Sequence, residues 1–263
     1  MGVRALAAAL GLLAASLAAS SGARAEEDLA RKGLEIARAA NLANKGFVAE
    51  QAVVTMQLIN AHGDVTRRKL AIVTLEGRED GDRSKVVFEW PPDVKGTKLL
   101  TWTHKRGDDD QWLYLPAIKR TRRISGSNKA GSFMGSEFAY EDLVGAEPEK
   151  FTYRYLDQVK VAGRDSDHFE RFPVDRNSGY GRQVVWLDKE YQNPVRVEYY
   201  DRGNVLLKVA TPADYRRLGA LWRATLVTME NVLTKKRSIF TWESRQLGAP
   251  LSPSQFDSAR LED

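Results

Sequence analysis

Residues able to do catalytic or metal chemistry are few and scattered in this chain. None of the three histidines, His62, His104 and His168, has a second histidine or a carboxylate at the spacing of a metal-ligand motif. The absence of cysteine excludes disulfides, thiolate metal sites and a cysteine nucleophile. No G-x-S-x-G nucleophile elbow is present either. The sequence therefore predicts no metal, no cofactor and no enzymatic activity.

Two charged runs are candidates for binding rather than catalysis. The acidic run 108–110 could attract a cation, but it lacks the glycine and distal glutamate of a calcium loop, so a solvated hairpin tip is the favoured interpretation. The second run is basic and consists of Lys119, Arg120, Arg122 and Arg123. We predict that it forms a charged strand. A solvated, aggregation-resistant strand is the favoured interpretation, and contact of these four residues with an anionic headgroup or a partner surface is the functional hypothesis.

Residues 112–144, WLYLPAIKRTRRISGSNKAGSFMGSEFAYEDLV, combine aromatic, basic, glycine-rich and acidic side chains. Phe133 and Met134 lie between glycines, where no regular element would present them to a core. This composition predicts a mobile flap over residues 125–143 that covers an apolar cavity. The predicted cavity and flap residues are Trp102, Trp112, Tyr114, Phe133, Met134, Phe138 and Tyr140. The alternative, favoured for Trp90 and Trp102 on regular strands, is that these aromatic residues form the core.

The same segment resembles a known family. The order YLP, a basic strand and GSF-GS-F-YEDL, with the W-PP-D--G strand entry upstream, is similar to the LolA-like outer-membrane lipoprotein-sorting family of periplasmic proteins, some of which are associated with RND-type exporters. The specific part of the similarity spans residues 90–143. It does not place the lid-closing arginine of the better-known carriers.

The resemblance implies a function and partners. The protein would be a non-catalytic carrier that binds a lipid or the acyl chains of a lipoprotein in an apolar cavity. It would hand this cargo to an outer-membrane acceptor or to an acceptor linked to an RND-type inner-membrane exporter. We expect a monomer that binds no nucleic acid.

Residues 1–25 have the organisation of a signal peptide. Arg4 supplies the positive n-region, residues 5–19 an apolar run, and Ala23-Arg24-Ala25 a cleavage site. Removing two basic and no acidic residues would lower the net charge from +5 to +3. We predict a periplasmic mature chain that starts at Glu26, forms a single domain over residues 26–263 and, without a cysteine, carries no lipid anchor.

The remaining sequence predicts an α+β fold. Residues 26–45 have the composition of an amphipathic helix, and 252–261 that of a short terminal helix with Phe256 and Leu261 facing inward. Between them, period-two apolar patterns and tight turns predict an antiparallel meander. The expected strands are 47–58, 65–75, 84–89, 97–105, 111–115, the basic strand, 152–159, 168–173, 182–187, 195–200, 205–211, 221–231 and 237–244.

So many strands must curl to bury their apolar face. We therefore predict a strongly curved, open half-barrel with helices and the flap over its concave face. Two functional alternatives stay open. One is a periplasmic adaptor of an RND-type exporter that binds protein and no lipid; the other is a lipid-modifying enzyme that uses Asp142 or Glu141 with His104.

Overall fold

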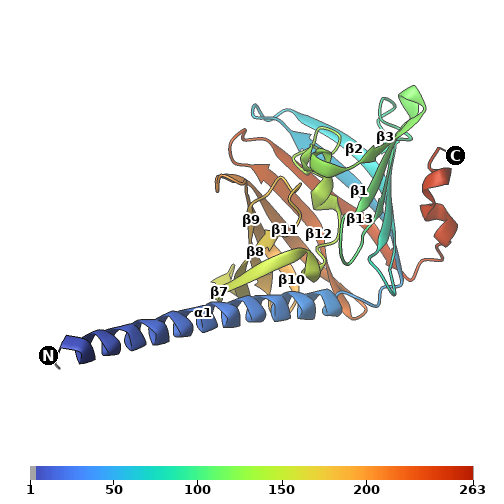
Figure 1. The fold of residues 1–263 in the computed structure, drawn as a ribbon. Helices are drawn as coiled ribbons and strands as arrows, with labels where there is room; N and C mark the ends of the chain where they lie inside the picture. Colours follow the sequence, from blue (N-terminus) through green and yellow to red (C-terminus); the bar gives the residue numbers. More distant parts are fainter. Residues whose placement is uncertain (1–3, 263) are drawn as a thin grey trace.

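The computed structural model describes residues 4–262 and shows one strongly curved sheet with a long N-terminal helix along one end (Figure 1). The helix, α1, spans Arg4–Ala43. The strands are β1 (Ala49–Ile59), β2 (Val65–Leu75), β3 (Arg83–Trp90), β4 (Lys98–Trp102), β5 (Asp110–Leu115), β6 (Arg120–Ile124), β7 (Phe151–Val161), β8 (Arg164–Pro173), β9 (Arg182–Asp188), β10 (Asn193–Tyr200), β11 (Leu206–Leu218), β12 (Leu221–Asn231) and β13 (Arg237–Leu247).

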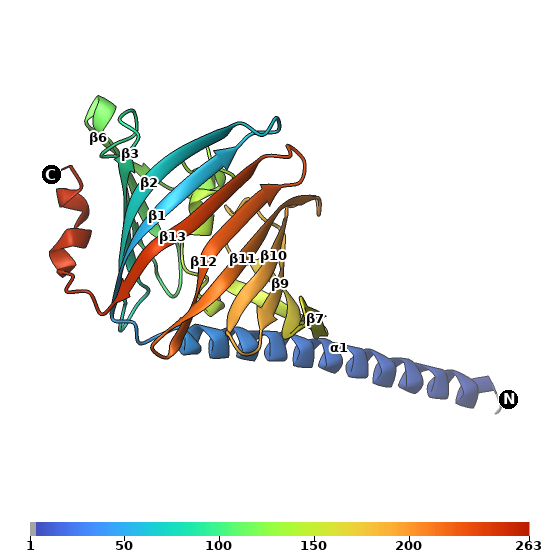
Figure 2. The same ribbon diagram turned by 180° about the vertical axis from the view of Figure 1, so that it is seen from behind.

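All thirteen strands belong to a single sheet, in the order β6-β5-β4-β3-β2-β1-β13-β12-β11-β10-β9-β8-β7. Neighbours pair antiparallel, and β1 pairs with both β2 and β13. The sheet is thus a meander whose first and last strands meet in the middle. Its two edges, β6 and β7, follow one another in the sequence. The sheet curls without closing, which confirms the predicted open half-barrel (Figures 1 and 2).

The period-two patterns assign the faces as expected. On β1, Ala52, Val54 and Met56 are buried in the main hydrophobic core, whereas Gln51 on the opposite face is exposed. The concave face collects such residues from strands of both halves, together with aromatic residues of the segment between β6 and β7. The main core therefore lies inside the curve of the sheet.

A second, smaller cluster lies on the convex face of β4 and β5. Phe256 and Leu261 of the C-terminal segment are buried against Leu100, with Trp102 and Trp112 packed beside them. Figure 2 shows this segment outside the sheet. The segment forms two 3-10 helices, Pro253–Phe256 and Ser258–Arg260, instead of the predicted single helix. The extended conformation of Asp257, whose side chain caps the second of them, interrupts the helix.

Helix α1 packs across β7 at the other end of the half-barrel. A side chain at Gly33 would place its Cβ 2.8 Å from the Cβ of Tyr153, so this helical glycine permits a close approach. Helix α1 continues through most of the predicted signal peptide, of which residues 1–3 lie outside the described residues. Cleavage after Ala25 stays a prediction. Between residues 4 and 262, no helix is long and apolar enough to span a membrane.

Candidate functional site

The segment 125–150 connects the two edges of the sheet. It consists of the predicted flap, residues 125–143, and its continuation to the start of β7, and it is called the flap from here on. It contains three short 3-10 helices, Gly126–Ala130, Tyr140–Leu143 and Pro148–Lys150. Because β6 and β7 lie at opposite edges, this connection must cross the open side of the half-barrel. It therefore covers the concave face, as predicted for the flap.

The middle of the flap is a tight hairpin that pushes aromatic side chains into the core. Ser132 and Ala139 form a β-bridge, and the amide of Phe133 donates to the carbonyl of Phe138 at 2.7 Å. Met134 and Gly135, at the centre of the turn, both have positive φ (51° and 79°), as type I′ hairpin turns require. Gly135 is thus part of a defined hairpin turn, whereas the sequence predicted a mobile, loosely held segment here.

The aromatic side chains of the hairpin fill the concave face. Phe133 is 1% exposed, and its ring centroid lies 5.7 Å from those of both Phe88 and Tyr140. Phe138 stacks on Phe240 of β13, with centroids 4.5 Å apart and rings within 5° of parallel. Met134 packs against the same core and is partly buried. In the structure, then, the flap itself occupies the apolar surface that we predicted it to cover.

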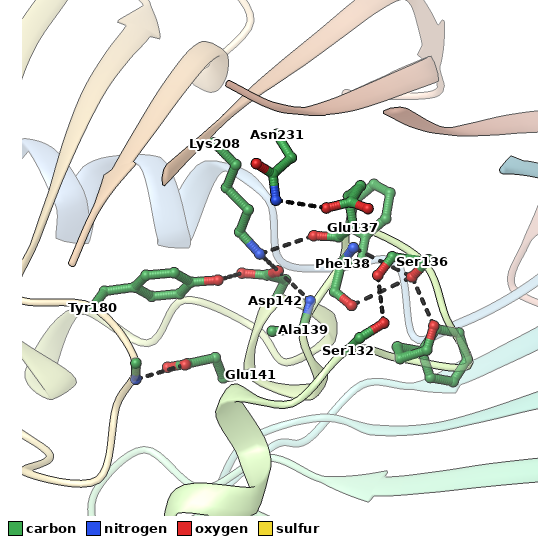
Figure 3. Close-up of polar contacts among 12 residues, drawn as sticks. Ser132, Ser136, Glu137, Phe138, Ala139, Glu141, Asp142, Tyr180, Lys208 and Asn231 are labelled. Atoms are coloured by element: carbon green, nitrogen blue, oxygen red, sulfur yellow. Dashed lines mark hydrogen bonds and ion pairs between the residues drawn. The ribbon is translucent and has the colours of Figure 1, made fainter. Parts of the chain in front are cut away.

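A buried ion pair holds the far end of the flap to the sheet (Figure 3). Asp142 lies 2.6 Å from the ammonium group of Lys208 on β11, and the two side chains are only 2% and 8% exposed. The same carboxylate accepts hydrogen bonds from the Tyr180 hydroxyl at 2.8 Å and the Ala139 amide at 2.6 Å. Burial raises the pKa of Tyr180 well above its usual value, which keeps the hydroxyl protonated as a donor.

Further polar contacts continue this attachment on either side of Asp142. The Glu137 carbonyl accepts from Lys208 at 3.0 Å, and the Glu137 carboxylate accepts from Asn231 at 2.8 Å. Glu141 accepts from the Ser178 hydroxyl at 2.7 Å and the Gly179 amide at 2.9 Å, while burial raises the pKa of the Glu141 carboxyl. Figure 3 shows Glu137, Glu141 and Asp142, which all come from the flap. The flap is thus attached to the β9–β12 half through carboxylates.

On the opposite half, an arginine holds the turn of the hairpin. Arg68 of β2 donates from Nη1 to the Met134 carbonyl at 2.5 Å, and its guanidinium lies 5.7 Å from the Phe88 ring. Burial lowers the pKa of Arg68. Our sequence reasoning missed this residue. It could have been found from the alternation of β2, because Arg68 lies two residues before the buried Leu70 and therefore projects from the same, inward face.

We expect Arg68→Gln to loosen the hairpin without unfolding the sheet. A hydrogen bond from a charged donor contributes about 1.5–3 kcal/mol, so its loss favours local opening of the flap. Hydrogen exchange at the amides of residues 133–140 should accelerate about tenfold or more. Arg67→Gln, an exposed neighbour on the other face of β2, is the matched control and should leave exchange unchanged. Equal exchange in both variants would contradict a role for Arg68 in holding the flap.

A cavity of about 470 Å³ remains beside the flap, between the β5–β6 edge and strands β7–β10. Apolar lining comes from Ile124, Val144 and Phe151, and polar lining from Arg171, Gln183 and Tyr199. Its volume lies within the ~300–1,000 Å³ range of small-molecule pockets. The concave side is therefore only partly filled by the flap.

Known structures share this fold over the whole sheet. The crystal structure of an outer membrane lipoprotein-sorting protein domain from Vibrio parahaemolyticus is 42% identical in sequence and superposes with a TM-score of 0.87, covering 89% of this chain and 100% of that chain. This chain belongs to the outer-membrane lipoprotein-sorting family. The resemblance found in residues 90–143 is thereby confirmed.

Two further structures place the family among known folds. A DUF1329 family protein from Desulfovibrio piger has a TM-score of 0.84 at 28% identity, covering 89% of this chain and 99% of that chain. A LolA superfamily protein from Nitrosomonas europaea has a TM-score of 0.66 at 18% identity, covering 89% and 98%. The half-barrel is therefore a LolA-type fold. A family model described as an uncharacterized protein matches residues 80–263, and no curated protein matches.

The predicted cavity residues of this lipoprotein-sorting family member divide between the two faces of the sheet. Phe133, Met134, Phe138 and Tyr140 meet on the concave side. Trp102, Trp112 and Tyr114 lie in the convex cluster beneath the C-terminal segment, where the Trp102 indole donates to the Phe256 carbonyl at 2.8 Å. Their placement differs from the prediction because alternate residues of a strand point to opposite faces. On β5, Gln111 and Leu113 face inward instead.

The basic run forms edge strand β6 as predicted. Arg120 and Arg122 lie opposite Leu115 and Leu113 and therefore share the concave side, whereas Arg123 lies opposite Trp112 on the convex side and pairs with Asp110. Lys119 precedes the strand as the left-handed cap of the 3-10 helix Pro116–Ile118. The two inward-facing arginines are exposed. Contact with a headgroup or partner stays a prediction for all four residues.

Two of the three acids of the acidic run have partners, whereas Asp108 is exposed, as expected for a hairpin tip. Asp109 pairs with Lys150 at the end of the flap, and Asp110 pairs with Arg123 and lies 3.1 Å from Nε2 of His104. The other nitrogen of His104 lies 2.6 Å from Asp80. His104 is thus held by these two carboxylates and not by Glu141 or Asp142, so the pairing required by the enzymatic alternative is not formed. Among the described residues, no group of three or more potential ligands could hold a metal ion.

The His104 contacts should make stability depend on pH. The hydrogen bond to Asp80 raises the pKa of His104 and lowers that of Asp80 to about 2. The stabilisation from His104 is complete below its unfolded pKa near 6.5 and is lost as pH rises through the higher folded value. The stabilisation from Asp80 is complete above its ordinary pKa of 3.8 and is lost as the pH falls towards its folded pKa of about 2. Urea unfolding at pH 6 and pH 8 should show a loss that His104→Gln removes; an identical loss in the variant would contradict this assignment.

Proposed function

We propose that this protein is a periplasmic, non-catalytic carrier that binds a lipid or the acyl chains of a lipoprotein on its concave face and passes the cargo to an acceptor. One observation carries the proposal. The apolar concave face is filled by Phe133, Phe138 and Tyr140, which belong to a connecting segment and not to the sheet. The flap is thus an internal occupant that cargo can replace. Membership of the lipoprotein-sorting family supports this reading of the site.

Loading exchanges one apolar occupant for another. Opening the flap breaks the Arg68–Met134 and Lys208–Asp142 contacts and exposes the aromatic side chains together with the surface beneath them. An acyl chain then covers that surface, and each buried methylene contributes about 0.8 kcal/mol. A chain of about twelve methylenes can therefore offset the loss of about 1.5–3 kcal/mol for each displaced aromatic side chain. Closure of the flap favours release to the acceptor.

The proposed compartment is the periplasm. The n-region at Arg4, the apolar run and the Ala23-Arg24-Ala25 site support export, and the similarity to a lipoprotein-sorting domain agrees with that destination. N-terminal sequencing of protein from the periplasmic fraction should begin at Glu26. Recovery of an acylated or membrane-integral form would contradict the proposal.

The carrier function predicts lipid in the native protein. Native mass spectrometry of protein purified from the periplasm should show a bound species that disappears after lipid extraction. Extracted protein should regain that mass shift when it is mixed with a fatty acid or phospholipid. An empty protein that co-purifies with a tight membrane-protein partner and takes up no lipid would favour the adaptor instead.

The adaptor alternative rests on β6. This edge strand leaves one side of its backbone unpaired in the sheet and carries exposed Arg120 and Arg122. Such an edge suits an acidic surface of a partner. Reversing both arginines to glutamate should weaken membrane-partner association and remove its salt dependence while preserving the melting temperature. Unchanged association with unchanged salt response would leave β6 as a solvated, protected edge.

A further inference from the structure

A row of polar side chains crosses the concave face of the β7–β12 half. The strand register places Arg171 of β8, Gln183 of β9, Tyr199 of β10, Lys208 of β11 and Asn231 of β12 directly opposite one another in succession. Residues opposite each other on neighbouring strands project from the same face. Tyr199 belongs to the concave core, so the whole row faces the inside of the half-barrel.

The flap fills one end of this row with acids. Asp142 pairs with Lys208, and the Glu137 carboxylate accepts from Asn231. The other end has no such occupant. Arg171, Gln183 and Tyr199 line the 470 Å³ cavity that the flap leaves open.

Arg171 is a partly buried charge of that cavity with no carboxylate partner in the described part of the chain. Its Nε donates to the Gln183 side chain at 2.7 Å, and its guanidinium lies 4.6 Å from the Phe151 ring centroid. Among residues 4–262, it forms no ion pair with a carboxylate. The remaining guanidinium N–H groups are therefore free to bind a ligand, held in place by Gln183 and Phe151.

Six acids line the cavity, and five of them have partners of their own. Asp109 pairs with Lys150, Asp175 with Lys129, Asp142 with Lys208 and Glu149 with Arg38, while Glu141 accepts two hydrogen bonds. The sixth, Asp108, is exposed on a hairpin tip. The lining cation Arg106 lies on an exposed hairpin tip. Burial raises the pKa of Tyr199, so its hydroxyl stays protonated and can donate.

We propose that Arg171, with Gln183 and Tyr199, forms an anion subsite that binds the negatively charged head group of a lipid, a carboxylate or a phosphate. The apolar lining at Ile124, Val144 and Phe151 leads from this subsite towards the concave core. The head group would thus bind the Arg171 end of the row in the same way that the flap acids bind the Lys208 and Asn231 end. The inference rests on the carrier function proposed above and adds the charge of the cargo.

The test compares two ligands that differ only in the head group. Dodecanoate and dodecanol are titrated against the full protein carrying an uncharged fluorescent apolar probe. The wild-type protein should favour the acid, and Arg171→Gln should lower the ratio of acid to alcohol affinities by roughly ten- to a hundredfold, as expected for a charge-assisted hydrogen bond. Dodecanol affinity should stay unchanged. Arg171→Lys should retain part of the preference, and Arg176→Gln, which removes an exposed loop cation nearby, should retain all of it.

Each outcome has a separate meaning. Failure of both ligands to bind the wild-type protein overturns the carrier function itself. Binding without preference for the acid, or an equal loss for both ligands in Arg171→Gln, overturns only the anion subsite. Displacement of dodecanoate by millimolar inorganic phosphate assigns the subsite to a free anion and overturns a lipid head group. If Arg171→Gln does not fold, the wild-type comparison and Arg171→Lys still test the subsite, which is overturned if the wild type shows no preference for the acid or if Arg171→Lys keeps all of it.

Discussion

Replacing Phe133 with alanine should lower the free energy of unfolding of the ligand-free protein by about 3–5 kcal/mol. Phe133 is 1% exposed and contacts Phe88 and Tyr140, so its removal leaves a cavity in the concave core. If the flap competes with cargo for this surface, the same variant should bind a fluorescent fatty acid at least as tightly as the wild type. Stability of the empty protein and affinity for cargo should therefore change in opposite directions.

Urea unfolding and fatty-acid titration on the same preparations would measure both quantities. Trp112→Ala is the matched control, because Trp112 is an aromatic residue packed in the convex cluster away from the flap. It should reduce stability without altering fatty-acid affinity. A Phe133→Ala protein that keeps its stability and loses binding would instead show that Phe133 is a ligand contact on a loosely held flap.

Removing the charge of Asp142 should also be strongly destabilising. Asp142→Asn keeps the shape of the side chain but leaves the buried ammonium of Lys208 without its counter-ion, at a cost of about 3–5 kcal/mol. The flap should open more often, because Asp142 also accepts from Tyr180 and from the backbone at Ala139. Hydrogen exchange of the flap amides and urea unfolding of the variant would measure the two effects.

A second substitution separates charge burial from general damage. Lys208→Met removes the ammonium with a side chain of similar length, so the double variant Asp142→Asn/Lys208→Met should recover much of the stability lost in Asp142→Asn. Additive losses in the double variant would contradict an ion pair as the origin of the effect. Glu170, which pairs with both Arg182 and Arg154 elsewhere in the sheet, provides the comparison.

Most of the fold could be predicted because strand alternation is a local signal. The thirteen strands, the hairpin turns and the inward face of β1 follow from period-two patterns and turn residues. What local patterns do not contain is the pairing of β1 with β13, which joins residues far apart in the sequence, such as Met56 and Phe240, 184 positions apart. The sequence therefore predicted a meander and a half-barrel, but not that the chain starts in the middle of the sheet.

The candidate site was predictable only in part for the same reason. The flap was recognisable from its composition, and the burial of Tyr140 agrees with the inward position expected for it. Lys208, Tyr180 and Arg68 were missed because each meets the flap through a contact between residues 38–66 positions apart. Trp102 and Trp112 were misplaced because aromatic character does not show which face of a curved sheet a residue occupies. Trp112 is next to the inward-facing Leu113 on β5 and therefore points outward, and Trp102 lies on the same outward face of β4 as Leu100.

The strand order also determines when the sheet can be completed. Because β1 pairs with β13, one side of β1 lacks its partner until the C-terminal strand is available, and such distant pairing slows folding. Meanwhile the apolar face of β1–β6 is uncovered, a condition that favours aggregation. The hairpin that follows β6 is the next segment of the chain, and its Phe133 packs on Phe88 of that same half. The flap can thus cover the apolar face of β1–β6 before strands β7–β13 are available, and so limit aggregation of the partly folded chain. Pulse-labelled hydrogen exchange would then show flap amides protected before those of β13.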